Sequence, residues 1–285
     1  MSRAVSVLII ARLTLREAMR RRLLWALVGL TVLIVALTWW GFTRIADVSP
    51  VTGPTEMLGV SQVLVMLAFM FSFVLAMTAV FAASPSIGPE IESGLLLAIL
   101  ARPIGRAEVL FGRWLGLAVV LVAYAIVAGY LEIAAVGLAT GYLPADPAVA
   151  PLYLAGQTLV LLTLAIVFST RIASVAGGAI AVVAYGLAWM AGVLGGVGEA
   201  FHSDVLRAAG TIARLILPSD VLWRGAAGAL SPTDQVLSGS GVNAAIYRFS
   251  PFSGAAPEPY WLAWCIVWVV AVLWLGIVLL RRREV

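Results

Sequence analysis

Residues 60–83 read VSQVLVMLAFMFSFVLAMTAVFAA, a run of 24 positions without a charged side chain. A helix needs about 20 apolar residues to cross a hydrocarbon core of about 30 Å, so this run is long enough. It lacks the alternation of apolar and polar residues that is typical of strands in a membrane β-barrel. The run therefore predicts a helix that spans a lipid bilayer.

Similar runs occur elsewhere along the 285 residues. The other predicted spans are residues 23–42, 114–138, 152–170, 173–197 and 259–280. The composition agrees, because 62% of the residues are hydrophobic and 11% are charged, and the mean hydropathy is +1.06. Soluble proteins contain about 25% charged residues. We therefore expect an all-α polytopic membrane protein, residues 1–285 forming a single membrane domain with six transmembrane helices.

The arginines indicate how the chain is oriented in the membrane. With the N-terminus inside, the cytoplasmic segments hold thirteen arginines against five acidic residues, and the outer segments hold five arginines against eight acidic residues. Short flanks rich in arginine stay in the cytoplasm when helices insert. We therefore expect both termini in the cytoplasm. The net charge of +4 is then a topology signal, and no nucleic-acid partner is expected.

The first 22 residues are basic and amphipathic. Arg12, Arg16 and Arg20 share one face of a predicted helix, and another face is apolar, with Leu8, Ala11, Leu15 and Met19. No cleavage site of small residues follows the short apolar stretch, so we expect the segment to be retained. It predicts an interfacial helix over residues 1–22 with its arginines toward anionic headgroups of the inner leaflet. The alternative is a basic flank without this role.

Residues 84–113 connect the second and third predicted spans and are far more numerous than a simple turn needs. Pro89 and the glutamates after it predict the start of a helix that ends near Leu100, because proline and carboxylates both suit a first turn. Pro103 stops this helix. A second helical piece over residues 106–113 leads into the next span. The segment thus predicts a helix, a turn and a helix on the cytoplasmic surface.

These features resemble the permease subunits of the ABC-2 type transporter family, and the resemblance covers nearly the whole chain. It rests on the basic N-terminus, on PEIESG at 89–94, on LARPIGRAEVLFGR at 100–113, and on LPSD at 217–220 before a final span that ends in three arginines. The chain departs from the common pattern at Leu95, where threonine is frequent. Arg113 stands where lysine is usual and keeps the charge.

The resemblance implies a non-catalytic transport subunit that binds no cofactor or metal of its own. ATP and Mg are implied on a separate ABC ATPase subunit, and no GxxxxGK[ST] phosphate-binding motif occurs in the chain. The implied ATPase-coupling residues lie in the loop 84–113: Glu90, Glu92, Gly94, Pro103, Arg106, Gly112 and Arg113. The glutamates could instead only cap the helix, and Arg106 could contact lipid headgroups. The glycines and Pro103 are expected to shape the loop.

Among ABC-2 permeases, the chain is most similar to the permease of the transporter that serves copper-site maturation of nitrous oxide reductase. This similarity transfers no substrate, because no cluster of Met, His or Cys in the sequence suggests a path for copper. The resemblance implies export, a homodimer or heterodimer of permeases, and the cell membrane of a bacterium or archaeon.

Glu132 is the only ionisable residue placed well inside a predicted span. A carboxylate is costly in lipid, so it is expected to face protein or water. One interpretation assigns Glu132 to the export pathway. The other lets it reach the outer headgroup layer, since it lies about 18 residues beyond Trp114 on a helix that rises 1.5 Å per residue.

Two further spans contain unusual side chains. The fifth span has a strip of small residues that allows close helix packing, either at a dimer seam or within one subunit: Ala173, Gly177, Ala181, Ala184, Ala188 and Gly192. The second span is rich in Met and Phe, which either line a path for lipid-like cargo or serve ordinary packing: Met66, Phe69, Met70, Phe71, Phe73, Met77 and Phe81.

Residues 198–258 form the largest predicted extracellular segment. The pattern predicts an amphipathic helix over 203–217, a break at Pro218, and a second helix to about residue 230 that is capped by Ser219 or Asp220. We expect both helices to lie on the outer leaflet and cover the exit of the path. The later glycines and prolines predict a mobile tail that contacts an outer partner protein. The alternative is an inert connector.

Two other function classes have weaker support in the sequence. An ion-coupled transporter without an ATPase usually shows repeats, broken spans and buried carboxylates, and only Glu132 fits. An intramembrane serine protease is suggested by Ser240 between two glycines and by His202, but both residues fall in the outer segment, where a rigid, desolvated dyad is not expected. A single Cys and a single His exclude disulfide frameworks and multi-histidine metal sites.

Overall fold

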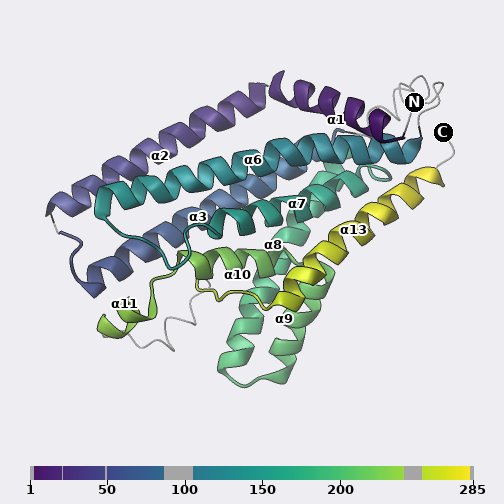
Figure 1. Ribbon diagram of the computed structural model, residues 1–285. Helices are drawn as coiled ribbons and strands as arrows, with labels where there is room; N and C mark the ends of the chain where they lie inside the picture. The colour runs from purple at the N-terminus through teal and green to yellow at the C-terminus, as the bar shows by residue number, and fades with distance from the viewer. Residues whose placement is uncertain (1–2, 21, 49, 87–104, 241–251, 283–285) are drawn as a thin grey trace.

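The computed structural model describes residues 3–20, 22–48, 50–86, 105–240 and 252–282, and it is an elongated bundle of helices (Figure 1). Within these described ranges, six helices are long and apolar enough to cross a membrane. They are α2 (Arg22–Val48), α3 (Pro54–Ala83), α6 (Arg106–Thr140), α7 (Ala150–Phe168), α8 (Ser174–Ala200) and α13 (Pro259–Arg281). They coincide with the six predicted spans, and the described ranges contain no strand. The expected fold class is confirmed.

Helix α6 is the longest of the described helices, and α1, α2 and α7 pack against it. It is continuous over 35 residues from Arg106, so the predicted helical piece 106–113 and the third span are one helix. It ends before Gly141, whose φ of 72° lies in the left-handed region that glycine adopts without strain. At 1.5 Å per residue α6 is about 52 Å long, longer than a hydrocarbon core of about 30 Å requires even with tilt. One part of α6 therefore extends beyond the membrane.

Helix α1 (Arg3–Arg20) packs along the first turns of α6. A Cβ on Gly112 would lie 3.0 Å from the backbone oxygen of Val7, and one on Gly116 would lie 2.6 Å from that of Ala11. These contacts advance by four residues on both helices, so α1 and α6 run side by side in the same direction. In Figure 1, α2 continues from α1 along α6.

Helix α7 lies at the centre of the bundle. In the most apolar stretch of α7, 67% of the residues are buried, against 11% in the corresponding stretch of α2. It contacts α3, α6, α8 and α13. The indole Nε1 of Trp114 on α6 donates to Thr163 Oγ1 at 2.9 Å, because a buried indole N–H needs an acceptor. The central position of α7 follows from side chains that are apolar on every face.

Helices α8 and α9 (Asp204–Ile216) form an antiparallel hairpin. A Cβ on Gly195 would lie 3.1 Å from the Cα of Gly210, so glycines allow the two backbones to approach closely. Most of the small-residue strip of α8 is buried against helices of the same chain, for example at Gly177 and Ala181. Of the two interpretations of this strip, packing within one subunit is the one that the structure supports.

Helix α10 (Ser219–Leu230) is buried, in contrast to the expectation that both helices of this segment lie on the surface. Ten of its twelve residues are buried, and Trp223 is only 1% exposed. A Cβ on Gly225 would lie 3.0 Å from the ring of Tyr153 on α7, so the helix is inserted against the core. No side chain caps α10, which follows Pro218. The expected helix bounds were accurate, but the expected surface position and cap of the second helix were wrong.

Beyond α10, the short helix α11 spans Asp234–Gly239. Most of the predicted mobile tail falls on residues 241–251, outside the described ranges.

Candidate functional site

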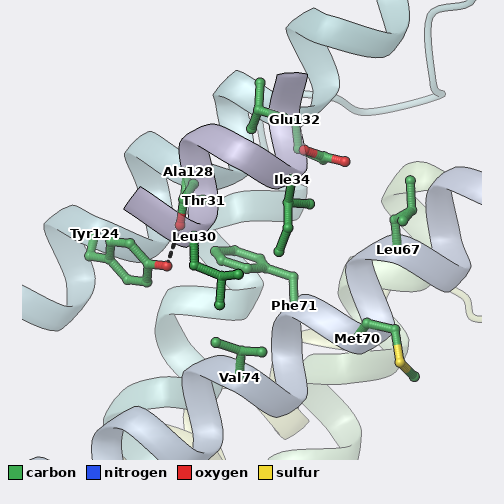
Figure 2. Close-up of a pocket in the computed structure, with 11 residues that line it drawn as sticks. Leu30, Thr31, Ile34, Leu67, Met70, Phe71, Val74, Tyr124, Ala128 and Glu132 are labelled. Carbon is green, nitrogen blue, oxygen red and sulfur yellow. Dashed lines mark hydrogen bonds between the residues drawn. The ribbon is translucent and has the colours of Figure 1, made fainter. Parts of the chain in front are cut away.

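A cavity of about 210 Å³ lies between α2, α3 and α6, beyond the part of α6 that contacts α1 (Figure 2). Eight of its eleven lining residues are apolar: Leu30, Ile34, Val35, Leu67, Met70, Phe71, Val74 and Ala128. The three others, Thr31, Tyr124 and Glu132, bring polar atoms to the wall. Such a mostly apolar cavity with a few polar groups is typical of small-molecule sites.

Two hydrogen bonds join α2 to α6 beside the cavity. Thr31 Oγ1 and the hydroxyl of Tyr124 are 2.5 Å apart. About two turns further along, Thr38 Oγ1 donates to Glu132 Oε1 at 2.7 Å. Thr38 is buried and Glu132 is half-buried. These bonds hold the peripheral helix α2 against α6 and fix the position of the Glu132 carboxylate.

The Met and Phe residues of α3 lie in different environments, and Met66, Phe73 and Phe81 are exposed on the surface of the bundle. Met70 and Phe71 line the cavity. Phe69 instead packs against Trp189, Trp223 and Phe252, with ring centroids 5.1, 5.2 and 5.3 Å away. One side of α3 therefore forms the cavity wall, and another contributes to the aromatic core around α10.

Of the predicted coupling residues, Glu90, Glu92, Gly94 and Pro103 lie outside the described ranges. Arg106 begins α6 directly after this segment.

The guanidinium of Arg106 binds the end of α13. Its Nη1 donates to the backbone oxygens of Leu280 at 3.1 Å and Arg281 at 3.2 Å, and Arg171 Nη2 donates to Leu279 O at 2.8 Å. The last carbonyls of a helix have no partner within it, and cations are favourable there. Arg106 therefore connects the start of α6 to the end of the last span.

Gly112 and Arg113 lie within α6, so neither forms part of a turn. Gly112 is buried, and a Cβ on it would lie 2.8 Å from Ile10 Cβ on α1. Arg113 is partly buried on the next position. Arg12 and Arg16 are exposed on α1, on the side away from α6, and Arg20 is the last residue of that helix.

A buried ion cluster joins α9 and α10, which sequence reasoning did not anticipate. Asp220 is 2% exposed, and its Oδ2 accepts from Arg214 Nε at 3.1 Å and Arg224 Nε at 3.0 Å. Arg224 Nη2 also donates to the backbone oxygen of Gly192 on α8 at 2.6 Å. The available signal was the spacing of Asp220 and Arg224, four residues apart on one helix.

Residues of the alternative functions lie away from the cavity. His202 is exposed in the turn between α8 and α9, and Ser240 follows α11. Among the described residues, no group of three His, Cys, Asp or Glu side chains is placed to hold a metal ion. The cavity between α2, α3 and α6 is therefore the candidate functional site among the described residues.

Comparison with known families agrees with this architecture. The model of the ABC-2 family transporter proteins matches residues 8–285, so the chain belongs to this family. No curated protein matches the chain. With six apolar helices of spanning length, the chain is a multi-pass membrane protein, the permease subunit of an ABC transporter.

Proposed function

We propose that this ABC-2 family permease is the membrane part of an exporter, driven by a separate ATPase subunit that docks on the cytoplasmic loop 84–113. One observation carries the proposal: this loop directly joins the two helices, α3 and α6, that form opposite walls of the cavity. A displacement of the loop therefore moves one wall relative to the other. Small sliding motions of packed helices are one established form of closure around a ligand.

Both ends of the loop are attached to other spans. At the α3 end, a Cβ on Gly178 of α8 would lie 2.9 Å from Ser84 Oγ, so α3 and α8 are in close contact there. At the α6 end, Arg106 binds the last carbonyls of α13. A force on the loop thus reaches α8 and α13 as well as α3 and α6.

Helix α1 also packs against the first turns of α6. Close packing at Gly112 and Gly116 makes α1 follow α6, and the hydrogen bonds of Tyr124 and Glu132 make α2 follow it further along. We infer that α1, α2 and α6 move as one unit against α3. Arg12 and Arg16 would hold the cytoplasmic end of this unit at the anionic inner leaflet.

The proposed assembly contains two permeases, identical or different, and two ATPase subunits that bind ATP and Mg. It lies in the cell membrane of a bacterium or archaeon, and the exposed part of the outer segment 198–258, which includes α9 but not the buried α10, is available to an outer partner. We also propose that the chain is related to the permease of the transporter that serves copper-site maturation of nitrous oxide reductase. This relation identifies no substrate.

Co-purification from the native membrane, followed by ATPase assays in lipid vesicles, tests the proposal. An ABC ATPase should purify with the chain, and Glu92→Arg should preserve membrane insertion while lowering the ATP hydrolysis of the complex. The matched control is Glu199→Arg, because Glu199 is exposed at the far end of α8. Equal hydrolysis in both variants would remove the loop from the coupling role. Transport without any nucleotide would favour the ion-coupled alternative.

A further inference from the structure

Glu132 presents a carboxyl group to a cavity that is otherwise nearly apolar. Its Oε1 accepts a hydrogen bond from the neutral hydroxyl of Thr38. Among the described residues, no arginine lies within ion-pair distance of this carboxylate. An uncompensated carboxylate is costly in an apolar environment. A positively charged ligand would supply the missing charge.

The same cavity contains an aromatic pair. The rings of Phe71 and Tyr124 lie 6.0 Å apart between centroids and are tilted by 57°, and both residues line the wall. The faces of aromatic rings attract organic cations, most strongly where water is excluded. Aromatic rings beside a carboxylate are therefore suited to a cation with apolar substituents.

The mouth of the cavity lies on the apolar surface of the bundle. Leu30, Ile34 and Met70 line it and are 43%, 38% and 49% exposed. Figure 2 shows that Leu30 and Ile34 come from α2 and Met70 from α3. Their exposure indicates an opening between these two helices. An amphiphile dissolved in the bilayer reaches such a mouth without crossing water.

We propose that the cavity between α2, α3 and α6 binds a lipophilic organic cation, with Glu132 as its counter-ion and with Phe71 and Tyr124 against the cationic group. The volume of about 210 Å³ suits this class, because a cavity of about 150 Å³ accommodates a benzene ring. The apolar remainder of the ligand extends through the mouth into lipid. As the substrate site, this assignment rests on the proposed export function.

Equilibrium binding to the purified full chain in lipid nanodiscs tests the assignment. The probes are benzyltrimethylammonium and its neutral isostere neopentylbenzene, in which carbon replaces nitrogen, with empty nanodiscs as the correction for lipid uptake. Glu132→Gln should weaken binding of the cation at least tenfold and leave binding of the neutral probe unchanged. Glutamine keeps an oxygen that accepts from Thr38, so the α2–α6 contact is retained. Glu199→Gln is the matched control and should bind both probes as the unmodified chain does.

A second variant keeps the assignment falsifiable if Glu132→Gln does not fold. Phe71→Leu removes a ring that makes no hydrogen bond and keeps an apolar side chain of similar size, so it should weaken cation binding severalfold without affecting the neutral probe. Equal loss of both probes, or no loss of either, overturns the assignment. The assay contains no nucleotide. If binding depends on Glu132 but no ABC ATPase purifies with the chain from the native membrane, only the proposed function is contradicted. If a coupled ATPase is found but no such binding, only the substrate class is contradicted.

Discussion

At the scale of single residues, Asp220 shows how one charge can join three helices. Its carboxylate is almost fully buried and accepts from Arg214 and Arg224. A Cβ on Gly192 would overlap the carboxylate carbon, so only glycine leaves room for the carboxylate beside α8. The expectation that Asp220 caps α10 considered only the local helix start. Burial changed its role, because a desolvated carboxylate gains more from two guanidinium groups than from backbone amides.

Replacement of this charge should destabilise the outer half of the bundle. In Asp220→Asn the two arginines, 17% and 20% exposed, lose their counter-ion, and breaking a buried pair costs about 3 kcal/mol or more. Thermal unfolding in detergent, followed by tryptophan fluorescence, should show a midpoint lower by several degrees. Asp204→Asn is the control, because its 3.4 Å pair with Arg207 is exposed and such pairs contribute about 0–1 kcal/mol. Equal midpoints for the two variants would contradict a stabilising cluster.

At the scale of elements, the sequence predicted helices better than their neighbours. The length of an apolar run is a local property, and this is why all six spans could be located. The burial of α10 was missed because its mixture of Arg, Asp and small residues gives it an amphipathic pattern. The overlooked signal was the run Gly225–Ala229, whose lack of bulk allows a helix to enter a crowded core.

The contact between α1 and α6 also depends on glycines, which have no side chain to keep the two helices apart. In Gly116→Ala the new Cβ would lie 2.6 Å from Ala11 O and 2.8 Å from Thr14 Cβ. Overpacking of this kind costs about 1–3 kcal/mol, so the backbone amides of α1 should exchange with deuterium faster, by roughly tenfold for each 1.4 kcal/mol.

The control substitution, Gly186→Ala, is expected to stabilise its helix instead of destabilising it. A Cβ on Gly186 in α8 meets no atom within 4 Å, and alanine is favoured over glycine within a helix by about 1 kcal/mol. Gly186→Ala should therefore leave exchange in α1 unchanged and slow it, if anything, in α8. If exchange in α1 is the same in Gly116→Ala and Gly186→Ala, the close α1–α6 contact does not stabilise α1.

At the scale of the whole molecule, the cavity could not be predicted from the sequence. Glu132 was identified as unusual because it interrupts an apolar run, but its partner Thr38 is 94 residues away, and no local pattern links them. The orientation of the chain, in contrast, is predicted by a count of arginines on the two sides. Figure 1 shows the start of α1 and the end of α13 at the same end of the bundle, as an even number of spans requires.

Cysteine labelling tests this orientation directly. Cys265 is the only cysteine and is buried, so Cys265→Ala provides a background for His202→Cys, in the turn between α8 and α9, and Arg282→Cys, after α13. Both positions are exposed. Because the arginine-rich segments should remain in the cytoplasm, a membrane-impermeant maleimide should label His202→Cys on intact cells and Arg282→Cys only after permeabilisation. The reverse pattern would invert the molecule and place the loop 84–113 outside, where no ATPase could reach it.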